Sequence, residues 1–354
     1  MLGRPDQDHA AALLEQVEQA LAQRTPLRIR GGDSKASLGR VTAGDSLDLR
    51  PHRGIVQYDP TELVITARAG TPLQVLHEAL DAAGQMLPCE APFAERGATV
   101  GGMVAAGLSG PRRPWAGAVR DFVLGTRVIT GHGKHLRFGG QVMKNVAGYD
   151  LSRLLAGSLG CLGVITEVSF KVLPKPRCCA SLTLAMDTAQ ALACLADWRQ
   201  QPLPISAACH DGERLHLRLE GGEGSVKAAM DRLGGESLDA GYWQDLNAQH
   251  LGFFADQRPL WRLSLPDNCP PLQLPGPQLL DWGGAQRWLH SCADEAQIRA
   301  VVSAHGGHAL CLTPGATLSP LHPLPAALLR YHRQLKAQLD PRGIFNPGRL
   351  YQEL

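Results

Sequence analysis

The chain has 354 residues, of which 44% are hydrophobic and 19% charged, with a formal net charge of +2. This length allows two or three domains with a substantial core, and so small a charge argues against nucleic acid or an anionic membrane as a partner. The sequence has no run of about 18 apolar residues and no signal-peptide pattern at Met1–His9, so we expect no membrane span.

The nine cysteines include no C-x-x-C pair and no spacing typical of zinc or iron–sulfur sites. Cys178 and Cys179 are adjacent, where a disulfide would be strained. We therefore expect reduced thiols in a cytoplasmic protein and no metal site.

The 39 glycines and 25 prolines exceed average usage and favour tight turns over a helical bundle. Ala10–Gln23 fits an amphipathic helix, and Thr71 and Pro72 fit the N-cap and first position of another. Residues 163–173 alternate apolar and polar side chains, which predicts a half-buried strand. Other elements expected in this half are strands at 27–30, 63–67 and 122–130, a return strand after the turn 131–134, and a short helix at 150–156.

Pro174, Lys175 and Pro176 mark the first predicted domain boundary. A mixed order of elements follows, which predicts a smaller α+β domain with a mainly antiparallel sheet. Its strands are expected at 182–186, 215–219, 261–265 and 308–312, and its helices at 188–199 and 293–304. A terminal amphipathic helix is expected at Ala326–Leu339. The predicted domains are residues 1–174, 177–320 and 321–354.

Three glycine-rich segments are candidates for binding a phosphate-containing ligand. After the strand at 27–30, Gly31-Gly32-Asp33-Ser34 can turn backbone N–H groups and a hydroxyl towards an anion, although a glycine pair after a strand is more often a simple turn. Residues 98–107 are nearly all small, so they need either a neighbouring backbone or a flat ligand against them. In the third segment, a short helix after 145–151 leads into the glycine-rich turn 157–166.

A fourth segment, residues 340–349, returns at the C-terminus and carries Phe345-Asn346-Pro347-Gly348; by itself it is a capped helix end followed by turns. The order and gaps of the four segments resemble the FAD-binding superfamily of vanillyl-alcohol oxidase, para-cresol methylhydroxylase and D-lactate dehydrogenases. Further stretches resemble the glycolate oxidase FAD-binding subunits, the GlcE family, over nearly the whole chain. These stretches are residues 59–64, 85–90, 110–115, 120–126, 142–150, 282–285 and 345–349.

The resemblance implies a two-part α+β FAD-binding domain, plus the smaller α+β domain, with FAD as cofactor. It places the pyrophosphate on the turn 31–34, the dinucleotide along 99–107, and Asn346 near the isoalloxazine. The cofactor-binding residues that we predict are Gly31, Gly32, Asp33, Ser34, Pro88, Thr99, Val100, Gly101, Gly102, Ala105, Gly107, Gly160, Gly163, Val164, Ile165 and Asn346.

The chain departs from this family at several positions. Some relatives attach FAD through a histidine where this chain has Asp33, so we predict non-covalent FAD. Relatives that oxidise D-2-hydroxy acids with a metal carry histidines in the second domain, whereas this chain has only His305 and His308 in a glycine-rich stretch. Leu159 replaces an acidic residue of the family. These departures argue against independent substrate oxidation.

The resemblance implies a subunit that helps to oxidise glycolate, or D-lactate, and passes electrons through flavin to an iron–sulfur partner subunit beside a larger FAD-containing subunit. Association with the inner membrane would occur through this complex. A free-standing FAD-dependent D-2-hydroxy acid dehydrogenase and a non-catalytic scaffold subunit are the alternatives.

Several further side chains are candidates for substrate contact. Each of five arginines could clamp a carboxylate, although surface solvation or a salt bridge to a partner is the commoner role of such a residue: Arg112, Arg113, Arg120, Arg330 and Arg333. Tyr149 is better explained as a packing residue, and Cys89 as a buried thiol. We assign no catalytic residue.

Overall fold

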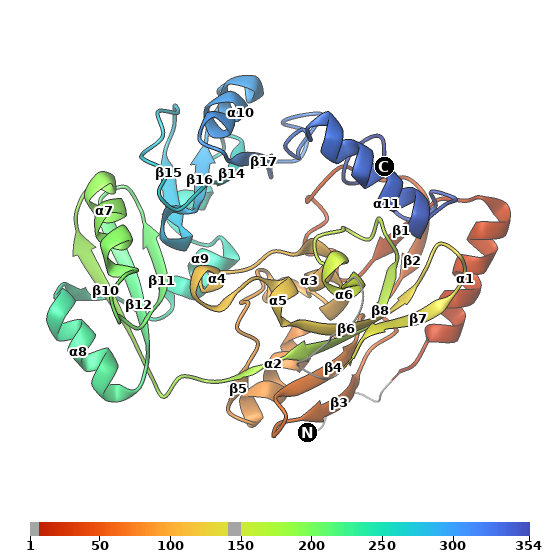
Figure 1. Cartoon of the computed structure of the whole chain (residues 1–354), viewed down its shortest axis with the longest axis horizontal. Helices are drawn as coiled ribbons and strands as arrows, with labels where there is room; N and C mark the ends of the chain where they lie inside the picture. Colours follow the sequence, from red (N-terminus) through yellow and green to blue (C-terminus); the bar gives the residue numbers. More distant parts are fainter. Residues whose placement is uncertain (1–6, 141–149) are drawn as a thin grey trace. The chain divides into compact units, whose positions relative to one another are not determined.

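The computed structural model describes residues 7–140 and 150–354 and divides the chain into two compact units (Figure 1). The first unit comprises Met1–Ser109, Gly117–Lys175 and Pro323–Leu354, and the second comprises Gly110–Ala116 and Pro176–His322. Gly110–Ala116 therefore belongs with the second unit, whereas the sequence predicts a single domain over residues 1–174.

The first unit is built on a five-stranded antiparallel sheet of order β3-β4-β8-β6-β7. Its strands are β3 (Ile55–Asp59), β4 (Val64–Arg68), β8 (Val164–Lys171), β6 (Val123–Ile129) and β7 (His135–Gly139). A parallel pair, β1 (Leu27–Arg30) and β2 (Asp45–Asp48), forms a second small sheet, and β5 (Gln85–Met86) pairs with β9 (Leu173–Pro174). The predicted strands in this region are confirmed, whereas β2 and β3 carry no strong sequence signal.

Strand β8 corrects the prediction that it is half-buried. All of its residues except Lys171 are buried, including Thr166, Glu167 and Ser169. The alternation misleads because these polar groups find partners inside: Arg127 Nη1 donates to Glu167 at 2.9 Å, and the hydroxyls of Ser169 and Thr66 lie 2.8 Å apart. Buried polar atoms with such partners are tolerated at the centre of a sheet.

The helices of the first unit are α1 (Ala10–Gln23), α2 (Leu73–Ala82), η1 (Ala94–Arg96), α3 (Val100–Ala106), α5 (Val119–Phe122), α6 (Leu151–Leu154) and α11 (Ala326–Leu339). The predicted N-cap of α2 is wrong: Pro72 is the N-cap, and the Thr71 hydroxyl instead accepts from Gly54 N at 2.9 Å. Helix α11 confirms the predicted amphipathic helix: Leu329, Leu335 and Leu339 are half-buried along one face, and Lys336 on that face is buried.

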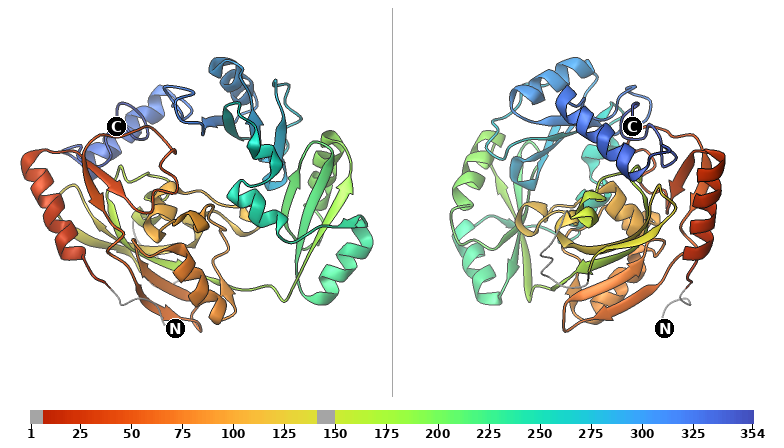
Figure 2. Two further views of the ribbon diagram at one scale, coloured as in Figure 1. Left: turned by 180° about the vertical axis from the view of Figure 1, so that it is seen from behind. Right: turned by 45° about the vertical axis from the view of Figure 1, so that its right-hand side comes forward.

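The C-terminal segment closes the first unit by pairing with β1. Leu27 N donates to Ile344 O at 2.7 Å, and Asn346 N donates to Leu27 O at 3.0 Å. Figure 2 shows the first and last stretches of the chain, red and dark blue, within this same unit. Residues 323–354 thus complete a sheet that begins more than 300 positions earlier in the chain.

The second unit contains an eight-stranded sheet of order β13-β10-β12-β11-β15-β16-β14-β17, in which every recorded strand pair is antiparallel, as predicted. Its strands are β10 (Cys178–Ala185), β11 (Ile205–His210), β12 (Arg214–Gly221), β13 (Glu236–Ser237), β14 (Leu260–Ser264), β15 (Gln278–Asp281), β16 (Gln286–His290) and β17 (His308–Cys311). Its helices are α4 (Arg113–Ala116), α7 (Thr188–Trp198), α8 (Glu223–Leu233), α9 (Tyr242–Ala248), η2 (Gly252–Ala255), η3 (Trp282–Gly284) and α10 (Glu295–Ala304).

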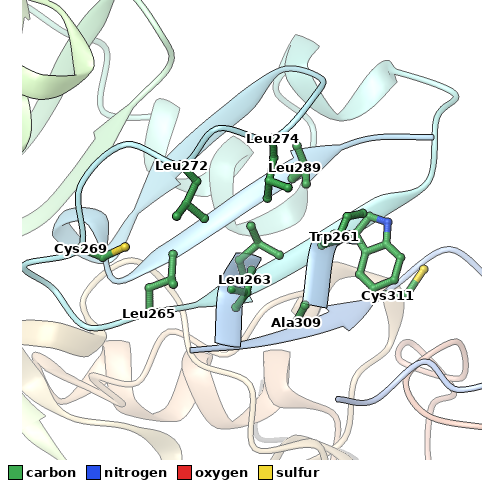
Figure 3. Close-up of a cluster of buried hydrophobic side chains, with 11 residues drawn as sticks. Trp261, Leu263, Leu265, Cys269, Leu272, Leu274, Leu289, Ala309 and Cys311 are labelled. Carbon is green, nitrogen blue, oxygen red and sulfur yellow. The ribbon is translucent and has the colours of Figure 1, made fainter. Parts of the chain in front are cut away.

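The two faces of the second unit's sheet differ in character. On one face, apolar side chains pack beneath helices; Figure 3 shows the cluster around Trp261, Leu263 and Leu289, which Ile298 and Val302 of α10 complete. The other face carries an aromatic cluster near α9 and a series of charged and polar side chains. Among residues 7–140 and 150–354, no helix has the length and hydrophobicity needed to cross a bilayer.

Candidate functional site

A groove open to solvent lies in the first unit, and its empty space, counted with the solvent at its mouth, is about 430 Å³. Its walls come from segments that are far apart in the sequence: the end of β1, helix α3, the turn after residue 157, and the C-terminal segment. The lining residues are Ile29, Arg30, Gly31, Leu49, Ala69, Thr99, Gly101, Gly102, Ala105, Leu159, Gly160, Gly163, Ile165 and Asn346.

The turn after β1 requires glycine at two successive positions. A Cβ on Gly32 would lie 1.7 Å from Gly97 O, and a Cβ on Gly31 would lie 2.4 Å from the Thr99 hydroxyl. The backbone of this turn therefore touches the segment that leads into α3. Only glycine at both positions permits this close approach of the two segments, and Gly31 also lines the groove.

Asp33 has a partner that explains how an acid can stand in this turn. Its backbone is left-handed, with φ of 54°, and its Oδ2 accepts from Arg30 Nε at 2.7 Å. The ion pair compensates the carboxylate charge, which would otherwise repel a phosphate. Next to it, Lys35 Nζ donates to Ser34 Oγ at 3.3 Å, and burial lowers the pKa of Lys35 to about 8.

Helix α3 uses its small residues on two sides. On one side, a Cβ on Gly101 would meet the Ala69 side chain at 2.7 Å, so the helix packs closely against the end of β4. On the other side, Gly102 and Ala105 line the groove. The small residues of α3 therefore allow close backbone packing on one face and leave a flat, open wall on the other.

Asn346 ties three segments of the groove together. Its Oδ1 accepts from Ile29 N at 2.9 Å, and its Nδ2 donates to Leu159 O at 2.7 Å. The side chain is 2% exposed, and a Cβ on Gly160 would lie 2.7 Å from Nδ2. Both polar ends of the amide are used by the protein, so Asn346 positions β1 and the turn at 159–160 at the groove.

A buried ion pair between Lys336 and Asp340 lies next to the segments that carry Asn346 and Cys161. Lys336 Nζ donates to Asp340 Oδ2 at 2.6 Å, to Cys161 O at 2.7 Å and to Phe345 O at 2.8 Å. Asp340 in turn accepts from the backbone of Phe345 at 2.8 Å. The pair is fully satisfied, and it fixes α11 to both segments that flank Asn346.

The structure brings part of the predicted cofactor set to the groove. The predicted residues that line it are Gly31, Thr99, Gly101, Gly102, Ala105, Gly160, Gly163, Ile165 and Asn346. The others, which lie in adjoining turns or within the core, are Gly32, Asp33, Ser34, Pro88, Val100, Gly107 and Val164. The predicted set lacks five of the lining residues. Ile29, Arg30 and Leu159 stand within the sequence motifs, whereas Leu49 and Ala69 belong to no motif and only the fold brings them here.

The candidate arginines have different surroundings. Arg112 forms a bidentate pair with Glu220 within the second unit, so its guanidinium is occupied by the protein's own carboxylate. Arg113 stacks on the Trp282 ring at 4.4 Å from its centroid. Arg120, Arg330 and Arg333 are exposed.

The remaining candidates fall outside the groove. His305 caps α10 and His308 begins β17, so the two do not share a helix face. In the described ranges, no group of three or more His, Cys, Asp or Glu side chains is arranged to hold a metal. Burial raises the pKa of the Cys89 thiol to about 12, which leaves it unreactive. Tyr149 and the rest of 145–149 lie outside the described residues.

Comparisons with known proteins agree with this geometry. Residues 7–139 match the family model of an FAD binding domain. The glycolate oxidase subunit GlcE of Escherichia coli is 60% identical over 98% of this chain and 99% of its own length. A D-lactate dehydrogenase of Archaeoglobus fulgidus is 26% identical over 93% of this chain and 86% of its own length.

Other relatives share a part of the chain or its fold alone. The glycolate oxidase subunit GlcD of Bacillus subtilis is 34% identical over 44% of this chain and 33% of its own length. The solved structure of an alkyldihydroxyacetonephosphate synthase matches with a TM-score of 0.68 at 17% identity, over 97% of this chain and 76% of that one. This structural likeness identifies the two-part FAD-binding fold.

Proposed function

This chain belongs to the GlcE family of glycolate oxidase subunits, within the FAD-binding oxidoreductases, and we propose that it is the FAD-binding subunit of a complex that oxidises glycolate to glyoxylate. The observation that carries the proposal is the groove at which the end of β1, α3, the 159–165 turn and Asn346 meet.

The residues present fit FAD because the wall is made largely of backbone. Gly31, Gly32 and the following Ser34 offer N–H and hydroxyl donors for a diphosphate without side-chain bulk. Gly102 and Ala105 leave room along α3 for the rest of the dinucleotide. When bound, FAD supplies a two-electron acceptor that can release its electrons singly; the protein contributes its position and electrostatic surroundings.

The turn also supports a dissociable cofactor. Asp33 stands where some superfamily members carry a histidine that bonds to FAD, and its carboxylate is paired with Arg30. A carboxylate paired with an arginine does not form the covalent bond to FAD that the histidine forms. Acid precipitation of the purified chain should therefore release all flavin into the supernatant; flavin that stays with the precipitated protein would contradict the proposal.

The names of two relatives support partner subunits for this chain. GlcE and GlcD are both described as subunits of glycolate oxidase, which supports a multi-subunit enzyme for this chain as well. We propose that a larger FAD-containing subunit and an iron–sulfur subunit complete it, with electrons leaving through the iron–sulfur subunit.

An anaerobic absorption spectrum of the purified chain, alone and in the complex, tests the function. We expect one bound flavin per chain and bleaching of the flavin in the complex when glycolate is added. Dithionite serves as the control for a reducible flavin. A chain that retains no flavin after reconstitution would overturn the proposal, and steady turnover of D-lactate by the isolated chain would favour a free-standing dehydrogenase.

A further inference from the structure

The polar face of the second unit's sheet is defined where β14 pairs with β16 and β17. Trp261 and Leu263 point into the apolar cluster of Figure 3. Because side chains alternate along a strand, Arg262 between them points to the opposite face. Directly opposite residues share a face, so Trp288 and Leu310 lie beside Arg262, and Gln286 and His308 lie beside Ser264.

Arg262 is a partly buried cation on this face. Its Nε is buried and has no hydrogen-bond partner in the part of the chain that the structure describes. The guanidinium carbon lies 5.9 Å from the centroid of the Trp282 ring, and that of Arg113 lies 4.4 Å from the same ring. Burial, and then the positive charge of Arg113, lower the pKa of Arg262 to about 10. Two arginines are therefore held near each other around one indole.

The Trp282 indole beside these two arginines is held by a hydrogen bond, and its backbone is strained. Trp282 Nε1 donates to Gly110 O at 3.0 Å, and the ring is 5% exposed. The residues Trp282, Gly283 and Gly284 all have positive φ, of 55°, 63° and 97°. A tryptophan in this conformation costs free energy, and such strain persists only where the surrounding contacts hold it in place.

The acidic group near Arg262 has hydrogen-bond partners of its own. Asp281 accepts from Trp282 N at 2.7 Å and from Gln286 Nε2 at 3.0 Å, and it is 3% exposed. The charge of Asp281 acts on Arg262, and burial, followed by the positive charge of Arg262, lowers the pKa of His308. We call Arg113, Arg262, Asp281, Trp282 and His308 the Arg262 cluster.

A fully buried arginine of the same unit, Arg287, has a hydrogen-bond partner for every guanidinium nitrogen. Arg287 is 0% exposed, and its three nitrogens donate to the carbonyls of Gly284, Pro270 and Cys269 at 3.2, 2.7 and 2.5 Å. Arg262 differs from Arg287 because its buried Nε has no partner among the described residues, and a buried donor left without a hydrogen bond costs free energy. A carboxylate, which can accept two parallel N–H bonds, is the ligand that best offsets this cost.

We propose that the Arg262 cluster is a binding site for the carboxylate group of a small hydroxy acid. Arg262 binds the carboxylate through its guanidinium, Arg113 adds a second positive charge, and His308 at the start of β17 lies beside Ser264 on the same face. The choice of a hydroxy acid rests on the proposed function; the anion site itself rests on the geometry of the second unit.

Calorimetric titration of the FAD-loaded full chain with sodium glycolate, at constant ionic strength, tests this site. Loading the chain with FAD fills the proposed cofactor site, so that the groove of the first unit does not add a second anion site. We expect the wild-type chain to bind one glycolate, and Arg262→Met to raise the dissociation constant at least about tenfold, as expected for loss of a charge-assisted hydrogen bond. Arg262→Lys should recover part of the affinity, because the charge returns without the fork.

The matched control is Arg258→Met, which removes an arginine just before β14 whose side chain pairs with Asp256. It should leave the dissociation constant within about twofold. Glycolate that does not bind the wild-type chain, or binds Arg262→Met as tightly, would overturn the site. If Arg262→Met has no cooperative melting transition and therefore does not fold, Arg113→Met replaces it as the test variant. Unchanged glycolate affinity in Arg113→Met would also overturn the proposed site.

The outcome separates this inference from the proposed function. Flavin content and glycolate-dependent bleaching of the complex are measured on the same preparations. A complex that bleaches normally while Arg262→Met leaves the affinity unchanged rejects the site alone. A wild-type complex that never bleaches rejects the function, whereas titration with acetate still reports whether the cluster binds a carboxylate.

Discussion

In the first unit, the groove wall is formed largely by glycine and alanine backbone, and its one buried amide, Asn346, bonds to other segments of the protein. In the second unit, the polar sheet face offers side chains instead: arginines, a histidine and a carboxylate around Trp282. Backbone donors are rigid and tolerate no added atoms, whereas side-chain charges can be removed singly. The two units should therefore respond differently to substitution.

The largest effect is expected for Gly32→Ala in the first unit. The new Cβ would lie 1.7 Å from Gly97 O, and two backbone segments cannot yield as a flexible side chain can. We expect a loss of more than about 4 kcal/mol in the free energy of unfolding, and an FAD dissociation constant raised at least about a hundredfold. Fluorescence titration of FAD and chemical denaturation measure both. Unchanged FAD affinity would mean that this turn is not part of the cofactor site.

The second prediction concerns a charge pair of the second unit. Arg112→Met leaves Glu220, whose side chain is 8% exposed, without its bidentate partner. We expect a loss of about 3 kcal/mol in the free energy of unfolding, at the low end for a broken buried pair because Arg218 stays 3.6 Å from Glu220. FAD affinity should not change. A weakened FAD affinity in this variant would contradict the assignment of FAD binding to the first unit alone.

Histidine 52 should make the stability of the first unit depend on pH. Its side chain is 1% exposed, and its Nδ1 accepts from His9 N at 3.0 Å, which requires that nitrogen to be unprotonated. Burial outweighs the nearby Asp8 carboxylate and lowers the pKa of His52 below the ordinary 6.5. The unfolded chain therefore takes up the proton first as pH falls.

The stabilisation from neutral His52 is complete above the unfolded pKa. It is lost as pH falls below about 6.5, by at most about 1.4 kcal/mol per pH unit. Urea denaturation at pH 7.5 and 5.5 should show the difference between wild type and His52→Gln shrinking at the lower pH. The control variant is His250→Gln, because His250 is exposed. If wild type and His52→Gln differed in free energy of unfolding by the same amount at both pH values, the assignment to His52 would be contradicted.

The smallest effect, and the counterpart to Gly32, is expected for Gly224→Ala in α8. A Cβ at this position would meet nothing within 4 Å, and the residue is helical. Alanine should stabilise the chain by about 0.5–1 kcal/mol, because glycine is entropically costly in a helix. Thermal denaturation would detect the gain, and a loss of stability would show that glycine sensitivity is general rather than confined to the groove.

Much of the fold follows from local patterns. The bounds of α1 and α11, strand β1 and the antiparallel character of the second unit's sheet agree with periodicity and turn residues. The turn at 31–32 and the small-residue run of α3 are also visible in the sequence, because consecutive glycines and alanines permit a close backbone approach that larger residues prevent. In contrast, the polar residues of β8 suggest an exposed face that the fold covers, since periodicity reports chemistry and not what packs against it.

What the sequence by itself determined is the type of element at most positions and the glycine motifs of a dinucleotide-binding wall. Only the tertiary structure decided that Gly110–Ala116 joins the second unit and that Arg113 and Arg262 share one indole. The reason is distance along the chain. Turn and helix preferences act over a few residues, whereas Arg113 and Arg262 are almost 150 positions apart and meet only because β14 and the turn at Trp282 place them together.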